Sequence, residues 1–454
     1  MHSTSVFDSF GRSVSVDFNS VISQYGGLVA LVHILHKSGF LEKLTSKVLS
    51  TLPRDKRRAD RVQHSHRDMF LQRLLGLLVG KEDLNDSPLL QSDPGFLAAF
   101  GKQQLASAST LCRFERSVTQ ETIDAGNALL LDMYLRYAPR RKYIFIDIDN
   151  TPVELFGHQE GVKFNGHYRC NCYLPLLAFI DGFPVGVFNG TQDGRKAATT
   201  PFKTMVDKIR KANPNAVIVL RADSGFNGGG LIQACEDKSC FYLIGLAPNK
   251  ALLKRVEAWE PEFTEAIKRP PQYGGNLLRR LGEIDDYQAK SWNGPRRVIV
   301  RDYWSEERQE QDTRFIQTNI KAANSAKTKC GKLALYSAQQ LYDLLYCARG
   351  TEEKFNQEFK VQAHGARSSS TLFLTNSYRM LLGAFCQLAY RLMRIFCFKT
   401  GNRFREATLD SVRRTFICCP ASIRSFKRKI QITLSSSMLP LSGDLQRIWW
   451  GYQP

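Results

Sequence analysis

The sequence lacks the features of a secreted or membrane-spanning protein. Its first 20 residues contain no basic segment followed by an apolar run, so no signal peptide is visible. No stretch of about 20 apolar residues is free of charge, and the most apolar candidate, 380–397, contains Arg391 and Arg394. We therefore expect a cytoplasmic protein with no membrane partner.

Several site-defining patterns are missing as well. The 11 cysteines are odd in number and form no C-x2-C pair, a pattern that supports neither a disulfide framework nor a structural zinc site. No glycine-rich loop ends in Gly-Lys-Ser/Thr, and no G-x-S-x-G occurs. P-loop nucleotidases and serine hydrolases built on a nucleophile elbow are therefore not expected.

Acidic residues are scarce relative to basic ones. The 454 residues include 63 Lys and Arg but only 43 Asp and Glu, which gives a net charge of +20. Such an excess favours a polyanionic partner, most often nucleic acid, although a merely soluble basic protein is the alternative. Hydrophobic residues (43%) and charged residues (23%) have ordinary shares, which excludes a disordered or fibrous chain.

The first 138 residues place apolar side chains at helical spacing and predict a helical region. The segment 107–110, Ser-Ala-Ser-Thr, precedes an amphipathic stretch that carries Arg113 and Arg116. A Ser/Thr cluster in this position predicts a capped short helix. Such a helix either enters a DNA groove or packs in a bundle with its arginines in solvent.

Buried strands dominate from residue 139 onward. Short β-rich runs occur at 143–149, 173–180, 183–188, 217–220 and 241–245. Asp181-Gly182 between the second and third run is a hairpin signal, and helical stretches cover 197–212 and 231–238. The order strand, hairpin, helix, strand, helix, strand predicts a mixed α/β sheet of the ribonuclease H-like kind.

The rest of the chain predicts an interrupted domain. Residues 251–330 begin helical and become strand-like, a regular helix returns at 338–360, and an amphipathic, basic helical tail follows from 370. We therefore expect N-terminal and C-terminal helical regions around a divided α/β domain. The expected parts are a helical N-terminal region (1–138), the first part of the α/β domain (139–250), a β-rich insertion (251–330), the second part of the α/β domain with an acidic helix (331–397) and a basic C-terminal region (398–454).

Acidic residues lie at the ends of two predicted strands. Asp147 and Asp149 are two residues apart on one strand, so their side chains project from the same face. Asp223 lies just beyond another buried strand, where Gly225 permits a sharp turn. Since ligands collect at the carboxyl ends of strands in α/β sheets, Asp149 and Asp223 are candidate site residues.

The helix predicted at 338–360 has one polar stripe. At about 100° per residue, Tyr346, Arg349, Glu353 and Lys360 fall within about 60° of arc. The apolar residues expected on the opposite face are Leu341, Leu344, Leu345, Phe355 and Phe359. Taken alone, a solvated surface with an Arg–Glu ion pair explains this stripe.

The spacing within the stripe resembles a family signature. Tyr-x2-Arg-x3-Glu-x6-Lys, met here from Tyr346 to Lys360, is similar to the motif around the third acidic residue in DDE transposases of bacterial insertion sequences. Asp149-Asn-Thr151 resembles the Asp-x-Thr that ends the first strand in that family. The segments 221–226 (Arg-Ala-Asp-Ser-Gly-Phe) and 157–166 (Gly-His-Gln-Glu-Gly-x3-Asn-Gly) resemble further motifs. The resemblance extends over roughly residues 20–400, and the long stretch between Asp223 and Glu353 fits the β-rich insertion of this branch.

The resemblance implies a transposase that binds the inverted terminal repeats of an insertion sequence, cleaves DNA at the element ends and transfers the 3′ ends to target DNA. It makes Asp149, Asp223 and Glu353 the catalytic residues and the ligands of Mg²⁺, with Mn²⁺ as a substitute. Carboxylate oxygens suit these hard cations, and two metal ions suit an in-line displacement at phosphorus.

Further roles follow from the same resemblance. Arg349 and Lys360 would hold DNA phosphates, Tyr346 would contact the terminal nucleotide, and Asp147 is a candidate for a supporting acid behind the metal ligands. We expect a homodimer on double-stranded DNA, both element ends and target, associated with the nucleoid. The alternatives are a catalytically inactive or repurposed DNA-binding protein and a structure-specific nuclease of the ribonuclease H class.

Overall fold

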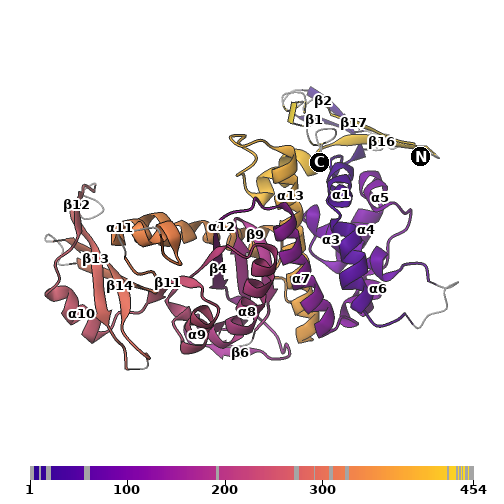
Figure 1. Ribbon diagram of the computed structural model, residues 1–454. Helices are drawn as coiled ribbons and strands as arrows, with labels where there is room; N and C mark the ends of the chain where they lie inside the picture. The colour runs from indigo at the N-terminus through magenta and orange to yellow at the C-terminus, as the bar shows by residue number, and fades with distance from the viewer. Residues whose placement is uncertain are drawn as a thin grey trace. The chain divides into compact units, whose positions relative to one another are not determined.

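The computed structural model describes residues 5–9, 12–16, 22–55, 62–190, 194–269, 276–290, 292–305, 310–322, 327–426, 429–435, 438, 441, 443–444 and 448. The chain divides into two compact units (Figure 1). The first, which we call the helical unit, comprises Met1–Gly126, Glu358–Arg367 and Leu381–Pro454. The second, the sheet unit, comprises Asn127–Gln357 and Ser368–Met380.

A 9-stranded sheet organises the sheet unit, in the order β12-β13-β14-β15-β11-β10-β4-β8-β9. Its core strands are β4 (Tyr143–Asn150), β8 (Leu176–Ile180), β9 (Phe183–Phe188), β10 (Val217–Ala222) and β11 (Phe241–Leu246). Strands β4, β10 and β11 are parallel, whereas β8 pairs antiparallel with β4 and β9 pairs antiparallel with β8. The order β9-β8-β4-β10-β11 is the ribonuclease H arrangement, so the predicted mixed α/β fold is confirmed.

The core strands form because their apolar side chains are covered on both faces. Every residue of β8 and β10 is buried, as expected for strands in the middle of a covered sheet. Helices α8 (Gly194–Ala212) and α9 (Gly229–Asp237) connect β9 to β10 and β10 to β11. The other face packs against the helical segment η7 (Gly331–Leu335) to η8 (Leu341–Tyr346) in one apolar cluster. The turn between β8 and β9 has φ of 50° at Asp181 and 75° at Gly182, which confirms the predicted tight hairpin.

The β-rich insertion continues the same sheet. Its elements are α10 (Lys250–Glu257), β12 (Phe263–Ile267), β13 (Leu277–Tyr287), β14 (Arg296–Ser305) and β15 (Glu310–Thr318). Strand β15 pairs antiparallel with β11 of the core, and β14, β13 and β12 follow outward. Trp292 is packed, because the Tyr287 ring meets it edge-on at 5.5 Å and the Arg296 guanidinium lies 4.6 Å from its ring.

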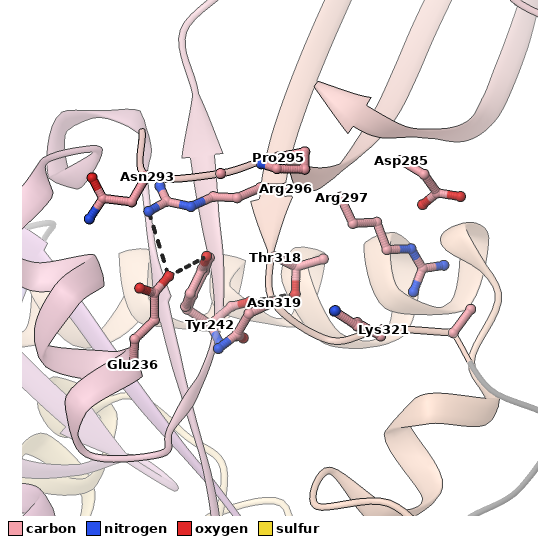
Figure 2. Close-up of a pocket in the computed structure, with 12 residues that line it drawn as sticks. Glu236, Tyr242, Asp285, Asn293, Pro295, Arg296, Arg297, Thr318, Asn319 and Lys321 are labelled. Atoms are coloured by element: carbon pink, nitrogen blue, oxygen red, sulfur yellow. Dashed lines mark hydrogen bonds and ion pairs between the residues drawn. The ribbon is translucent and has the colours of Figure 1, made fainter. Parts of the chain in front are cut away.

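A cavity of about 640 Å³ lies where the insertion joins the core. Figure 2 shows Glu236 of α9 facing both Tyr242 of β11 and Arg296 of β14, with each contact at 3.5 Å. On the other side of the cavity, Arg297 pairs with Glu283 and donates a hydrogen bond to the Ile320 carbonyl at 3.1 Å. The two arginines are thus neutralised by Glu236 and Glu283. Their contacts also hold β14 against α9 and against the residues that follow β15.

The helical segment after the insertion is irregular, so the prediction of one regular helix over 338–360 is wrong. It runs through α11 (Ala338–Gln340), the π-helical η8, the 3₁₀ turn η9 (Cys347–Gly350), α12 (Thr351–Gln357) and the π-helical η10 (Glu358–Gln362). Wide π turns and tight 3₁₀ turns change the rotation per residue, and Gly350 is a poor helix former. As a result Leu344, which was expected on the packed face, is 59% exposed.

Short helices and two longer ones build most of the helical unit, as predicted for the terminal regions. They are α1 (Leu28–Lys37), α2 (Phe40–Lys43), η1 (Leu44–Val48), η2 (Leu49–Thr51), α3 (His66–Leu78), η4 (Leu84–Asp86), α4 (Ser87–Gln91), α5 (Pro94–Phe100), α6 (Ala108–Arg116), α14 (Leu409–Val412) and η11 (Arg413–Ile417). Helices α7 (Gln120–Tyr137) and α13 (Phe373–Cys397) contribute residues to both units. By length and composition α13 could cross a membrane, but 83% of its most apolar stretch is buried inside the protein. Burial of that kind is expected of a core helix.

Strands at both ends of the chain correct the helical interpretation of these ends. Near the N-terminus β1 (Ser5–Ser9) pairs with β2 (Arg12–Val16), and β3 (Ile22–Ser23) follows. Strand β3 joins β16 (Ala421–Phe426), which pairs with β17 (Lys429–Leu434). The prediction of helix over 421–426 and 429–434 is wrong because polar and apolar residues alternate there with the period of a strand.

Two arginines of the basic tail are part of the core of the helical unit. Arg394 pairs with buried Glu358 at 3.0 Å. Arg413 donates hydrogen bonds to the carbonyls of Leu77 and Leu78, each at 3.1 Å. Buried ion pairs and carbonyl contacts of this kind hold the elements together, so these two charges are not available to DNA phosphates.

Candidate active site

Asp149 lies at the end of β4 in a partly buried position. The N–H of Asn150 donates to its Oδ1 at 3.0 Å, and Nδ2 of Asn356 on α12 donates to its Oδ2 at 2.7 Å. Burial raises the pKa of Asp149 to about 6; the charge of Arg349 opposes this rise and the charge of Asp223 adds to it. The structure therefore brings Asp149, Asp223 and Arg349 into one electrostatic environment.

Asp223 follows β10, the strand parallel and adjacent to β4. It caps the short turn η5 (Ser224–Phe226), and its Oδ1 accepts a hydrogen bond from the N–H of Gly225 at 2.9 Å. A Cβ at Gly245 of β11 would lie 2.6 Å from the Ser224 nitrogen, so only glycine permits this close approach. Because parallel strands end at the same edge, the two aspartates meet there.

Asp147 lies two residues before Asp149 and is held by a buried arginine. Nε and Nη2 of Arg221 on β10 donate to its two carboxylate oxygens, each at 2.5 Å. Nη1 of Arg221 also donates to the Leu345 carbonyl of η8 at 2.6 Å. Burial raises the pKa of Asp147, while the hydrogen bonds and charge of Arg221 lower it. Asp147 thus lies behind the site, in an ion pair that ties β4 and β10 to the helical segment carrying Tyr346 and Arg349.

A cavity of about 430 Å³ opens beside Asp223. Tyr346 and Arg349 line it from the helical segment, and the Arg349 guanidinium lies 5.8 Å from the Tyr346 ring centre. Arg314 lines it from β15 of the insertion and is exposed. The insertion therefore contributes directly to the wall of the site.

Glu353 is exposed on α12, three residues before Asn356. Side chains three apart on a helix are neighbours, so Glu353 lies one turn from the residue that contacts Asp149. Across the described ranges no group of three His, Cys, Asp or Glu side chains is close enough to hold a metal ion. Lys360 lies on η10 in the helical unit. The roles of Glu353 and Lys360 remain predictions.

The donors around Asp149 and Asp223 fit a hard divalent cation. Besides the two carboxylates, the buried amide oxygen Oδ1 of Asn356, whose Nδ2 contacts Asp149, has no hydrogen-bond partner in the part of the chain that the structure describes. An all-oxygen, negatively charged donor set is the kind that Mg²⁺ and Mn²⁺ prefer. A cation there would also offset the repulsion between the two aspartates.

A small sheet follows Asp149 directly in the chain. It contains β5 (Val153–Glu154), β6 (Lys163–Asn165) and β7 (Cys170–Tyr173), in the order β5-β7-β6. Tyr168 lies in the turn between β6 and β7. Burial raises its pKa, and the charges of Asp149 and Asp223 raise it further, which places Tyr168 within electrostatic range of both.

Sequence reasoning missed Asn356, Arg221, Arg314 and Tyr168. Arg221 precedes Asp223 by two residues, as Asp147 precedes Asp149, and this parallel spacing was a usable signal. Asn356, one helical turn after Glu353, was another. Arg314 and Tyr168 reach the site only through the tertiary fold, and no local pattern points to them.

Fold and site together define a ribonuclease H-like protein with paired aspartates at the carboxyl edge of its central strands. Residues 8–445 match the family described as Transposase DDE domain group 1, and the chain belongs to this family. The DDE transposase indicated by the Tyr346–Lys360 spacing is thereby confirmed. Enzymes of this family generally use divalent metal ions.

No curated protein matches the sequence. Among solved structures, the chain is similar to the protein in a cryo-EM structure of the piggyBac transposase synaptic complex with hairpin DNA, with a TM-score of 0.44 and 10% identity. That match covers 85% of this chain and 79% of the other.

Proposed function

We propose that this transposase binds the inverted terminal repeats of an insertion sequence, cleaves DNA at the element ends and joins the free 3′ ends to target DNA. The observation that carries the proposal is the pair Asp149 and Asp223, which end adjacent parallel strands and influence each other electrostatically beside Arg349. Family membership over residues 8–445 supports the same reaction class.

Each polar group at this edge has a role in the proposal. Asp149 and Asp223, with Glu353 from α12, would hold Mg²⁺ or Mn²⁺, which activates the attacking oxygen and stabilises the leaving oxygen when bound. Asn356 orients Asp149 through its hydrogen bond. Arg349 would hold a DNA phosphate with charge-assisted hydrogen bonds, Tyr346 would contact the terminal nucleotide, and Lys360 would hold a further phosphate.

Helix α6 supports DNA recognition by the N-terminal region. Ser107 caps the helix by accepting from the N–H of Thr110. On one face Glu115 is buried and paired with Arg73 at 2.7 Å, whereas Arg113 and Arg116 are exposed on the other. This division suits a helix that packs on one side and contacts duplex DNA on the other. In the proposal a homodimer holds both element ends, associated with the nucleoid in the cytoplasm.

The decisive experiment removes one negative charge at a time from the full-length protein. Asp149→Asn, Asp223→Asn and Glu353→Gln keep side-chain shape but weaken the metal site, so cleavage of end-containing DNA should fall by more than about 100-fold with Mg²⁺. Binding to the same DNA should stay within about twofold, since phosphate contacts come from the basic surface. Gel-based cleavage and fluorescence anisotropy measure the two effects.

The outcomes separate the competing functions. Wild-type-like cleavage by all three variants would rule out the proposed site. DNA binding by the wild type with no cleavage or joining would indicate an inactive or repurposed DNA-binding protein. Cleavage without transfer of 3′ ends to a target plasmid would indicate a structure-specific nuclease.

A further inference from the structure

The small sheet beside the aspartates exposes large aromatic side chains. Phe156 is 88% exposed, Phe164 is 64% exposed and Tyr168 is 38% exposed. All three lie between β5 and β7, in the stretch that directly follows Asp149. We call Phe156, Phe164, His167 and Tyr168 the aromatic surface. Large exposed apolar side chains that recur within one short stretch of chain indicate a binding surface.

The turn that carries part of this surface has a defined shape. Oδ1 of Asn165 accepts hydrogen bonds from the N–H groups of His167 (3.0 Å) and Tyr168 (3.2 Å). The two rings then meet edge to face with centres 4.7 Å apart, and Arg169 adopts φ of 55°. A non-glycine residue in the left-handed region is strained, so the turn is held in place rather than loosely extended.

The sheet is also fastened to the rest of the sheet unit. The N–H of Glu160 donates to the Thr371 carbonyl at 2.8 Å, and its carboxylate accepts from the N–H of Phe373 at 3.0 Å. Tyr173 packs edge-on against the Phe373 ring at 5.3 Å and donates to the Glu160 carbonyl at 2.6 Å. These contacts fasten the stretch that carries the aromatic surface to Thr371 and Phe373 of the sheet unit.

Position and charge indicate the kind of partner. Strand β5 begins four residues after Asp149, so the start of this small sheet lies within about 13 Å of that residue, or a few nucleotides along DNA. Tyr168, in the turn after β6, lies within electrostatic range of Asp149 and Asp223. Arg169, which directly follows Tyr168, is exposed, and the chain has a net charge of +20. Aromatic rings interleaved with cations bind unpaired bases, because every base stacks on a ring while its phosphate meets a positive charge.

We propose that the aromatic surface, in a role that rests on the proposed function, binds unpaired DNA bases next to the phosphate that is cleaved. Phe164 and Tyr168 supply stacking faces, and Arg169 contacts an adjoining phosphate. The bases must leave the duplex to reach the rings, so the surface favours DNA that is already unpaired at the cleavage point.

The test compares two DNA probes with the full-length protein. One probe is a fully paired duplex, and the other is a forked duplex with 2-aminopurine in its single-stranded arm. Wild type should bind the fork more tightly than the duplex and quench the 2-aminopurine fluorescence. Phe164→Ala and Tyr168→Ala should each weaken fork binding by about tenfold and leave duplex binding unchanged.

Two control variants sharpen the result. Tyr168→Phe keeps the ring and should bind the fork like the wild type. Phe426→Ala removes an aromatic ring of similar exposure, 56%, on β16 and should leave both affinities unchanged. Circular dichroism would check that each variant is folded.

Two results would overturn the proposal. In the first, both alanine variants bind the fork and quench the 2-aminopurine fluorescence as the wild type does. In the second, the alanine variants change their oligomeric state in light scattering but keep the DNA affinity of the wild type. The second result would make the surface an interface between copies of the chain. The proposed catalytic site is judged separately, because Asp149→Asn should keep the preference for the fork. A wild type that prefers the fork but cuts no DNA would contradict the proposed function and leave the base-binding surface standing.

Discussion

Asp149 is the residue at which burial and charge compete most directly. Its pKa in the folded protein is about 6, against an ordinary value of 3.8. The folded state therefore binds the proton more tightly than the unfolded chain does. In metal-free protein this stabilising contribution is fully present below about pH 4 and is lost as the pH rises through about 6.

Asp149→Asn should consequently stabilise the metal-free protein at high pH. A difference of about two pKa units corresponds to roughly 3 kcal/mol as an upper estimate. In the presence of a chelator, the thermal midpoint of the variant should exceed that of the wild type near pH 8 and match it near pH 4. Added Mg²⁺ should then raise the wild-type midpoint alone. An Asp149→Asn variant that is less stable than the wild type near pH 8 would contradict burial of the Asp149 charge as the cause of the raised pKa.

At the scale of single elements, the irregular helical segment sets the geometry of the site. The π-helical turn η8 buries Leu341 and Leu345, leaves Leu344 in solvent and carries Tyr346 to the pocket wall. Its Leu345 carbonyl also receives the Arg221 hydrogen bond. A regular helix would have placed Leu344 and Leu345 together on the packed face.

Two matched substitutions distinguish these geometries. Leu345→Ala removes a side chain that is 8% exposed and should lower the free energy of unfolding by about 2–4 kcal/mol. Leu344→Ala removes one that is 59% exposed and should change it by less than about 0.5 kcal/mol. Denaturant titration of both variants provides the measurement, and similar losses for both would support the regular helix instead.

The elements also show what could be predicted from the sequence. Runs of buried residues such as β10, and the Asp181-Gly182 turn, carry their signal locally and were predicted. The positions of Asp149 and Asp223 at one edge of the sheet could be predicted, because the ends of buried strands are visible in the sequence and parallel strands end at the same edge. The π and 3₁₀ turns were not predicted, since they arise when packing around η8 overrides average helical rotation. The Arg221–Asp147 ion pair was not predicted either, because it depends on the register between two strands that are distant in sequence.

For the molecule as a whole, the net charge of +20 governs association with DNA. Affinity for duplex DNA should fall with salt, with a slope of about −0.9 per phosphate neutralised. Arg394 and Arg413 are occupied inside the protein, so they should not contribute. The exposed Arg113 and Arg116 on α6 should contribute to phosphate binding. Changing both to Gln should therefore reduce the magnitude of the salt-dependence slope by about two. Anisotropy titrations over a range of KCl concentrations measure this, and a flat salt dependence would refute phosphate-dominated binding.

The pairing of β3 with β16 has a consequence for synthesis. Ser23 lies opposite Ala421, and the N–H of Gly26 donates to the Cys419 carbonyl at 2.9 Å. These partners are separated by roughly 400 residues, which a ribosome adding about 5–20 residues per second needs tens of seconds to make. The earliest part of the helical unit must therefore wait for the last, while the core strands of the sheet unit have already emerged. A prematurely terminated chain would carry Asp149 and Asp223 without a completed helical unit, and so without the end recognition that we assign to that unit.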